Sequence, residues 1–179
     1  MTRSELEHVI RASGSIAGDN ELIIIGSQSI LGQFPNAPPE LLVSMEADIY
    51  PKNKPEFAEL VDGSIGEGSF FHEEFGYYAQ GVGPETAVLP DGWQDRLIRI
   101  ESENTGGIAG LCLEVHDLAI SKYVAGRPKD RDFTRELARQ KMVEHKTLLQ
   151  RLSKTTVPRT AKARIRSFVD ADLGVSKKG

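Results

Sequence analysis

Two stretches decide the fold of this chain: LIIIGSQSIL at residues 22–31 and MEADIY at residues 45–50. The first is a short apolar run, typical of a buried strand, that ends in a Gly-Ser turn at residues 26–27. The second predicts a strand with two acids, Glu46 and Asp48, two residues apart. Because alternate strand residues point to the same face, both carboxylates are expected to aim at one point. If the two strands are neighbours, that point lies beside the turn.

The chemistry of these two features is complementary. The small turn at Gly26 and Ser27 offers backbone groups to a phosphate, and the paired carboxylates of Glu46 and Asp48 suit a divalent cation. Metal-assisted nucleotidyl transfer needs both. From the residues alone, a buried strand, a turn and an ordinary half-exposed strand are the simpler interpretation, so two interpretations stay open.

The spacing of these residues resembles a family signature. Gly26-Ser27, about twenty residues, then Glu46-x-Asp48 is similar to the signature of the nucleotidyltransferase superfamily that includes DNA polymerase β. In that superfamily the turn holds the triphosphate and the acidic pair holds magnesium. The resemblance therefore implies that Gly26 and Ser27 bind the substrate, and that Glu46 and Asp48 bind Mg²⁺ and are catalytic.

A second block strengthens the resemblance. Residues 113–133 read LEVHDLAISKYVAGRPKDRDF and resemble the Asp-Leu-x-x-x-Lys…Arg-x-x-Asp block of AbiEii-like toxin nucleotidyltransferases and their uncharacterised bacterial relatives. Residues 75–87 and 89–93 also resemble those relatives. The resemblance covers the chain from about residue 22 to residue 133.

The second block implies three further site residues. Lys122 would steady the phosphates as a point cation, Arg127 would grip a phosphate with two N–H groups, and Asp130 would orient one of them. From the residues alone, a solvated surface pair of Lys122 and Asp130, worth under about 1 kcal/mol, is the simpler interpretation.

Two departures from the superfamily pattern bear on activity. The first acid is Glu46, where the superfamily usually has Asp. The expected strand at 77–82 has Gln80 where a third carboxylate is expected, and Glu85 is the nearby substitute. Gln cannot act as a general base for an attacking hydroxyl. A second interpretation is therefore a catalytically impaired module that binds nucleotide, RNA or a partner protein.

Composition indicates a globular protein. The chain has 179 residues, 39% of them hydrophobic and 27% charged, which suits one or two small domains. No apolar run approaches the roughly twenty residues of a membrane span, and the start lacks the apolar core of a signal peptide. Cys112 is the single cysteine, so no intramolecular disulfide is expected and a reducing cytoplasm fits.

Charge is divided unequally along the chain. Residues 1–115 carry 6 Lys and Arg against 19 Asp and Glu, whereas residues 116–179 carry 16 against 7. A basic half is expected to meet an anion, or the two halves attract each other. Arg159, Lys162 and Arg166 share one helical face. That face suits a nucleic-acid backbone, a partner antitoxin, a second copy of the chain, or simply solvent.

The patterns together predict an α/β (α+β) fold. A small mixed-sheet nucleotidyltransferase-like core is expected over residues 1–115, with a helical C-terminal segment, 116–179, packed on it. The predicted strands and helices are as follows: strands at 22–25, 45–50, 77–82, 97–102 and 109–114, and late helices at 117–125, 130–140, 143–152 and 158–170.

Smaller features are predicted within this frame. Ser4 and Glu7 form a capping box that opens the first helix, and Gly14 stops it. Residues 63–68 form a glycine-rich surface loop, and residues 176–179 are frayed.

The resemblance implies a function as well as a fold. A Mg²⁺-dependent nucleotidyltransferase would move a nucleoside monophosphate from an NTP to a hydroxyl of RNA, tRNA included, or of a protein. It would act as a toxin–antitoxin component, with an antitoxin or a second copy of the chain as partner and no membrane involved. A non-enzymatic RNA-binding protein that uses the basic tail is a third interpretation.

Overall fold

The computed structural model describes residues 1–175. Two compact units divide the chain: residues 1–86 with 96–114, and residues 87–95 with the chain from Val115 onward. The end that was expected to fray, Ser176–Gly179, lies outside the described residues.

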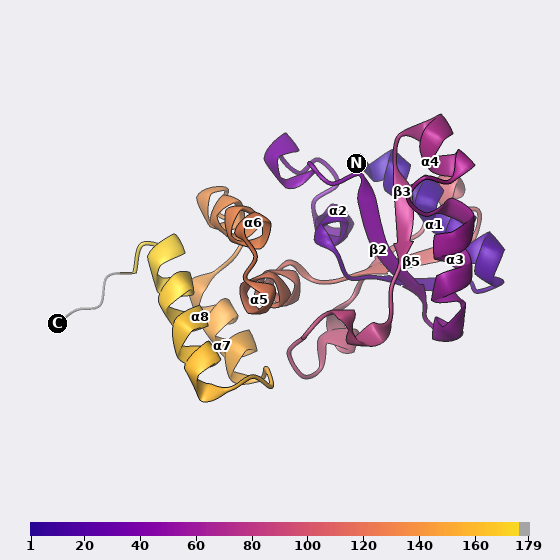
Figure 1. Ribbon diagram of the computed structural model, residues 1–179. Helices are drawn as coiled ribbons and strands as arrows, with labels where there is room; N and C mark the ends of the chain where they lie inside the picture. The colour runs from indigo at the N-terminus through magenta and orange to yellow at the C-terminus, as the bar shows by residue number, and fades with distance from the viewer. Residues whose placement is uncertain (176–179) are drawn as a thin grey trace. The chain divides into compact units, whose positions relative to one another are not determined.

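The first unit is built on a five-stranded sheet in the order β3-β2-β1-β5-β4 (Figure 1). Its strands are β1 Glu21–Ile24, β2 Glu46–Pro51, β3 Tyr78–Gly81, β4 Ile98–Ile100 and β5 Ala109–Cys112. β1 runs antiparallel to β2 and parallel to β5, β2 is parallel to β3, and β4 is antiparallel to β5. The predicted mixed sheet and α/β class are confirmed, and so is the predicted pairing of β1 with β2.

Four helices and several short 3₁₀ turns complete this unit. The helices are α1 Arg3–Ala17, α2 Ile30–Gln33, α3 Ala58–Ile65 and α4 Phe70–Phe75. The 3₁₀ turns are η1 Ser27–Ser29, η2 Pro39–Leu41, η3 Pro55–Phe57, η4 Pro84–Thr86 and η6 Glu103–Thr105, while η5 Trp93–Arg96 spans the boundary between the units. α1 and α3 pack on the sheet and on each other (Figure 1).

Alternation along the strands separates two faces of this sheet. Ile24 and Ile49 are paired and fully buried on the face toward α1 and α3, as are Ala47 and Ala79. The residues between them in sequence must point to the opposite face. The acids of β2 therefore project from the side that these two helices do not cover.

The first helix starts earlier than predicted. Its capping box uses Thr2 and Glu5, not Ser4 and Glu7: the Thr2 hydroxyl accepts from Glu5 N–H at 3.3 Å, and the Glu5 carboxylate accepts from Thr2 N–H at 2.6 Å. Glu7 is instead nearly buried on the helix side, where the guanidinium of Arg3 lies 3.0 Å from its carboxylate. The pairs Thr2–Glu5 and Ser4–Glu7 have the same spacing along the chain. Because Glu7 is buried beside Arg3, the capping box forms with Glu5.

The predicted stop at Gly14 is also wrong. α1 continues to Ala17 and ends at Gly18, whose φ of +60° provides the left-handed cap. Gly14 is tolerated inside the helix because Ile108 occupies its side-chain space: a Cβ there would lie 2.6 Å from Ile108 Cγ2. Close packing, not helix termination, requires this glycine.

The glycine-rich segment 63–68 is only partly a loop. α3 runs through Gly63 and Ser64 to Ile65, and Val61 and Ile65 are buried on its inner side. Burial of those two side chains extends the helix past a glycine that weakens it. The surface-loop prediction is therefore wrong for its first half.

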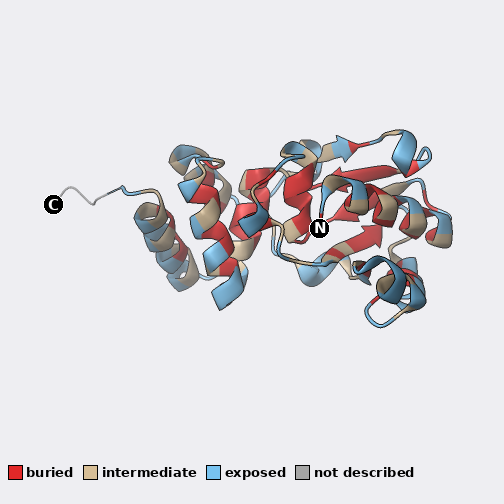
Figure 2. Cartoon of the chain, turned by 90° about the horizontal axis from the view of Figure 1, so that it is seen from above, coloured by how far each residue is buried: buried red, intermediate tan, exposed pale blue. Residues whose placement is uncertain are grey.

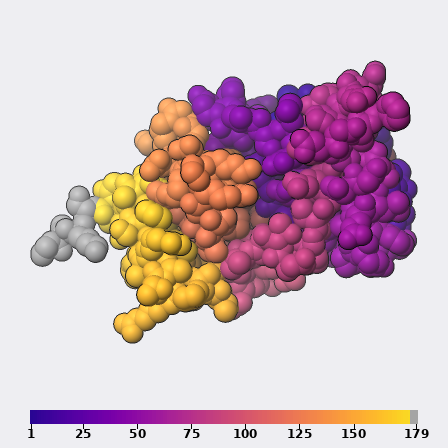
Figure 3. All heavy atoms as spheres, viewed as in Figure 1, coloured from indigo at the N-terminus to yellow at the C-terminus, as the bar shows by residue number. Residues whose placement is uncertain are grey.

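The second unit is helical. Its helices are α5 Val115–Ala125, α6 Pro128–Arg139, α7 His145–Ser153 and α8 Arg159–Asp172, each within two residues of its predicted bounds. α5 contacts the other three, and Figure 3 shows α8 in yellow beside the orange helices. Buried Leu118, Leu148 and Ile165 form part of its core, and Figure 2 shows such buried positions along the helices. The loop 87–95 joins this unit through the Asp91 N–H, which donates to Lys154 O at 2.9 Å.

No helix among residues 1–175 has the length and apolar character needed to cross a membrane.

Candidate active site

The Gly-Ser turn and the second acid of β2 are in direct contact. Beyond the end of β1, Ile25 N–H donates to Asp48 O at 3.1 Å and continues the pairing of the two strands. The next residue, Gly26, lies against the Asp48 carboxylate: a Cβ there would overlap Oδ2 and would lie 2.7 Å from Cγ. Only glycine leaves room for the Asp48 side chain at this point.

Three hydrogen bonds hold the turn in place. The Ser29 hydroxyl donates to Ile24 O at 2.6 Å, and Ser29 N–H donates to Gly26 O at 3.0 Å. Gln28 is fully buried and its amide donates to Ser44 O at 3.1 Å, which ties the turn to the segment that leads into β2. Ser27 remains half-buried between these anchors. The turn is therefore rigid where the sequence predicts a phosphate contact.

Glu46 and Asp48 share one face of β2 with two residues of the neighbouring strand. The register pairs Glu46 with Tyr78 and Asp48 with Gln80. The Tyr78 hydroxyl donates to Glu46 Oε2 at 3.3 Å. Burial, together with the nearby charge of Glu46, raises the pKa of Tyr78 to about 12, so the phenol keeps its proton and acts as a donor.

The side chains on this face that can act as oxygen ligands suit a magnesium ion. They are two carboxylates and the amide of Gln80, directly across from Asp48. Mg²⁺ is usually held by one or two carboxylates, with waters and substrate phosphates completing its shell. Within residues 1–175 no cluster of three or more His, Cys, Asp or Glu side chains suits a metal ion. Glu85 is the nearby acid that the sequence offers as a third carboxylate. It lies in η4 with its carboxyl folded against Gly83, where a Cβ would be 2.6 Å from Glu85 Cδ.

The second unit brings together the three residues of the second block. Asp130 is 2% exposed, and its carboxylate lies 2.7 Å from Arg127 Nε and 3.7 Å from Lys122 Nζ. Burial by itself raises the pKa of Asp130, but the hydrogen bonds from Arg127 and the charge of Lys122 outweigh it and hold that pKa below its ordinary value. The interpretation as a solvated surface pair is wrong, because Asp130 is buried.

Local sequence explains this arrangement. Gly126 ends α5 with a φ of +64°, Arg127 caps α6, Pro128 occupies its first turn, and Asp130 reaches back to Arg127 N–H at 3.2 Å. Proline in the first turn and an acid three residues after the cap are common helix-start signals. The spacing in the sequence therefore dictates the contact of Arg127 with Asp130.

A comparison with known protein families matches residues 4–172 to the family described as "Nucleotidyltransferase of unknown function (DUF6036)". The chain belongs to this nucleotidyltransferase family. The match confirms that the chain is a nucleotidyltransferase, as the Gly-Ser turn and the acid pair predict. No curated protein and no solved structure in the comparisons matches the chain. The nearer relation to AbiEii-like toxins stays a prediction.

Sequence analysis overlooked two residues of this nucleotidyltransferase. Tyr78 contacts Glu46, and its position two residues before Gln80 on the same strand was the available signal. Asp117, fully buried, lies 3.1 Å from Arg151 Nε and joins α5 to α7. This ion pair holds α5 and α7 together within the second unit.

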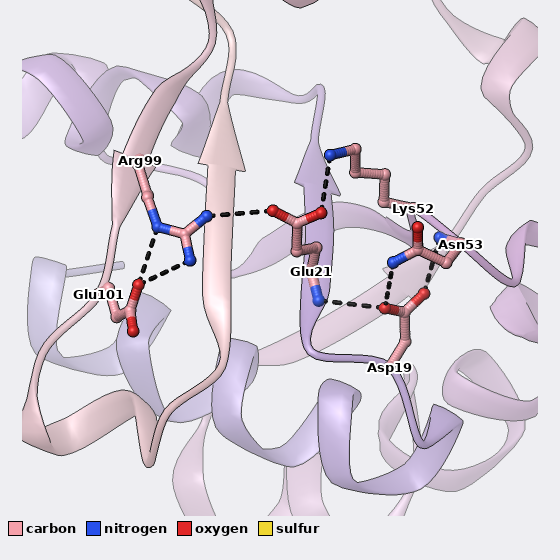
Figure 4. A network of polar contacts seen from close by, with 6 residues as sticks. All are labelled: Asp19, Glu21, Lys52, Asn53, Arg99 and Glu101. Carbon is pink, nitrogen blue, oxygen red and sulfur yellow. Dashed lines mark hydrogen bonds and ion pairs between the residues drawn. The ribbon is translucent and has the colours of Figure 1, made fainter.

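A polar network at the other end of β1 is structural as well (Figure 4). The Asp19 carboxylate accepts from Glu21 N–H at 3.1 Å and from both the backbone and the side chain of Asn53, at 2.7 and 2.9 Å. Burial acts to raise the pKa of Asp19, but these hydrogen bonds outweigh it and keep the pKa below its ordinary value. Glu21 in turn lies between Lys52 and Arg99. These contacts tie the start of β1 to the end of β2 and to β4.

The basic face of α8 is partly committed to the second unit. Arg159 and Arg166 are exposed, whereas Lys162 is half-buried and its ammonium donates to Ser153 O at 3.1 Å. Two of the three basic side chains on this face, Arg159 and Arg166, are therefore exposed enough to contact an anion.

Proposed function

We propose that this nucleotidyltransferase is a Mg²⁺-dependent enzyme that moves a nucleoside monophosphate from an NTP to a hydroxyl of RNA, tRNA included, or of a protein. The observation that carries the proposal is the contact of the Gly26 backbone with the Asp48 carboxylate. This contact brings together a turn whose backbone groups can bind a phosphate and an acid that can bind a cation, from segments more than twenty residues apart.

The residues of the first unit have separate roles in this reaction. Gly26 and Ser27 position the triphosphate through the turn, and Glu46 and Asp48, supported by Gln80, would hold Mg²⁺. When bound, the ion would neutralise charge on the phosphates and favour ionisation of the attacking hydroxyl.

Bond changes in the transfer follow from the substrates. The acceptor oxygen forms a bond to the α-phosphorus, the bond from the α-phosphorus to the α–β bridging oxygen breaks, and pyrophosphate leaves with that electron pair. The hydroxyl proton needs an acceptor, and Gln80 cannot serve. Glu46 and Asp48 are the described acids on this face of β2 that can take it.

For the second unit, the proposal concerns one ion cluster. Lys122 would steady the phosphates, Asp130 would orient it, and Arg127 would bind a phosphate oxygen. Burial of Asp130 between the two cations supports this assignment, because it fixes their side chains before any anion arrives.

Labelled nucleotides test the enzyme directly. Wild-type protein is incubated with each labelled NTP, Mg²⁺ and total RNA, and in parallel with protein acceptors. Asp48→Asn should abolish labelling, whereas Asp132→Asn, an exposed acid on α6, should not change it. Lys122→Ala should raise the KM for the NTP more than it lowers kcat. Absence of product with every nucleotide, and identical behaviour of Asp48→Asn, would contradict the proposal.

A second candidate is a nucleotide-binding module that no longer catalyses. Gln80, directly across from Asp48, is the observation that favours it. Calorimetry would then show Mg²⁺-dependent NTP binding without turnover, and Gln80→Asp would create activity by adding a proton acceptor. If wild type turns over and Gln80→Asp adds nothing, this candidate fails. Salt-sensitive RNA binding without any NTP binding would instead support an RNA-binding protein.

The setting proposed is a toxin–antitoxin pair related to AbiEii-like systems. The block around Lys122 and Asp130 supports it by resemblance, and an antitoxin or a second copy of the chain is the partner. We place the protein in the cytoplasm because its single cysteine, Cys112, is a buried free thiol. Co-expression with the product of the neighbouring gene, followed by a growth assay, tests this setting.

A further inference from the structure

Tyr78 occupies a specific place beside the acid pair. It lies directly across from Glu46 in the β2–β3 register, and its hydroxyl donates to Glu46 Oε2 at 3.3 Å. The side chain is 9% exposed, so the bond forms in a partly dry environment. That distance is longer than the roughly 2.5–3.0 Å usual for an O–H donor, so the contact directs the carboxylate without holding it tightly.

The tyrosine ring is itself supported from α4. The imidazole of His72 lies 4.6 Å from the Tyr78 ring, centroid to centroid, at an angle of 50°. His72 is fixed in turn, because Gly68 N–H donates to its Nδ1 at 3.0 Å. A chain of contacts therefore runs from the loop before α4 through two rings to the carboxylate of Glu46.

A glutamate that binds a cation gains from such support. Its side chain has one more rotatable bond than aspartate, and freezing that bond costs free energy. A donor that engages Oε2 restricts the orientation of the carboxylate. Neighbours that hydrogen-bond to ligating carboxylates typically change metal affinity by about 10- to 100-fold when they are removed.

We propose that Tyr78 is a positioning residue: its hydroxyl orients Glu46 so that Glu46 and Asp48 present oxygens to one divalent cation. This inference rests on the proposed function, since it assigns the acid pair to Mg²⁺. Nothing in the family description assigns a role to this tyrosine.

The experiment removes one hydroxyl group at a time. Tyr78→Phe keeps the ring against His72 and loses only the bond to Glu46. Tyr77→Phe is the matched control, because the hydroxyl of that adjacent tyrosine bonds His8 Nδ1 at 2.8 Å, away from the acid pair. Calorimetry measures, for wild type and both variants, the Mg²⁺ concentration that half-saturates binding of the preferred NTP. Tyr78→Phe should raise it about 10-fold or more, and Tyr77→Phe should leave it unchanged.

A double-mutant cycle separates positioning from a general structural effect. In a Glu46→Gln background, Tyr78→Phe should have no further effect on the Mg²⁺ requirement, because the oriented carboxylate is already absent. Equal effects of Tyr78→Phe in both backgrounds, or equal effects of the two tyrosine variants, would overturn the inference.

Crystal structures of metal-free wild type and Tyr78→Phe provide a readout that needs no metal. The Glu46 carboxylate should keep one orientation in wild type and lose it in the variant; an unchanged carboxylate overturns the role of Tyr78. If instead wild type and Asp48→Asn share the same Mg²⁺ requirement, the metal assignment of the proposed function fails, and the cation part of this inference fails with it. The two failures are therefore distinguishable.

Discussion

Glu46 in the first unit and Asp130 in the second are both acids of the candidate site, yet they are held differently. Asp130 is 2% exposed and lies against two cations of its own unit, one of them only three residues away. Glu46 is half-buried, and one of its contacts is with a neutral hydroxyl on the neighbouring strand. An acid buried against two cations can orient them, whereas a donor on a neighbouring strand can orient the acid itself. The two acids therefore fit the separate roles proposed for them: Glu46 would bind the metal, and Asp130 would orient cations that contact phosphate.

The largest expected effect is a loss of activity when the contact between Gly26 and the Asp48 carboxylate is disturbed. Gly26→Ala places a methyl group where the Asp48 carboxylate lies, so either the turn or the acid must move. A displacement of about 1 Å at a reacting centre lowers kcat/KM by about 100-fold. The assay with labelled NTP measures this loss, and circular dichroism checks that the variant is folded.

Gly63→Ala is the control for that substitution. Gly63 lies within α3 with no atom within 4 Å of its Cβ position, so alanine there should preserve activity and slightly stabilise the helix. If both alanine variants are fully active, the contact between the turn and Asp48 does not matter for the reaction.

The same contrast explains which parts of the site could be predicted from the sequence. Arg127 and Asp130 meet because a helix start has a local code, and Glu46 and Asp48 share a face because strands alternate. The partners across from them depend on the register of β2 and β3, which joins residues about thirty positions apart. No local pattern encodes that register, so Tyr78 was missed as the partner of Glu46.

Errors in the predicted fold have a similar origin. Strands and helices followed from hydrophobic periodicity, but glycines were misjudged because their role depends on tertiary contacts. Gly14 remains helical because Ile108 packs on it, and α3 passes Gly63 because Ile65 is buried. Only Gly18, with positive φ, ends the first helix as glycine is expected to do.

A medium effect is expected from the ion cluster of the second unit. Asp130→Asn removes the charge that Arg127 and Lys122 share, and hydrogen bonds to charged groups contribute about 2 kcal/mol each. Because asparagine keeps one acceptor oxygen for Arg127, the free energy of unfolding should fall by about the contribution of one such bond. Trp93 is the only tryptophan and belongs to this unit, so its fluorescence during urea unfolding reports the loss.

The pH dependence of that loss has a definite sign. The pKa of Asp130 in the folded chain lies below its ordinary value of 3.8, so its ionised form stabilises the fold at pH values above that. This stabilisation disappears as the pH falls through the lowered pKa, and wild type should then approach Asp130→Asn. Asp132→Asn, 76% exposed on the same helix, should change little at any pH. A stability difference that grows on acidification would contradict the burial argument.

The smallest expected effect is on RNA binding by α8. It separates contacts with an RNA backbone from contacts with the nucleotide. Arg159→Ala with Arg166→Ala removes two exposed cations, whereas Lys162→Ala removes one that already donates to Ser153 O. If this face follows a single-stranded RNA backbone, the double variant should bind RNA about 10-fold more weakly at low salt. The slope of log affinity against log salt should become shallower by about 0.7 for each lost phosphate contact. Lys162→Ala should change the slope less than the double variant does, and Mg·NTP affinity should stay the same in both, because the nucleotide is assigned to other residues. Filter binding over a series of salt concentrations measures the slope.

An unchanged slope in the double variant would leave α8 as a solvated or partner-binding helix, while loss of NTP binding in a folded variant would extend the nucleotide site to this face.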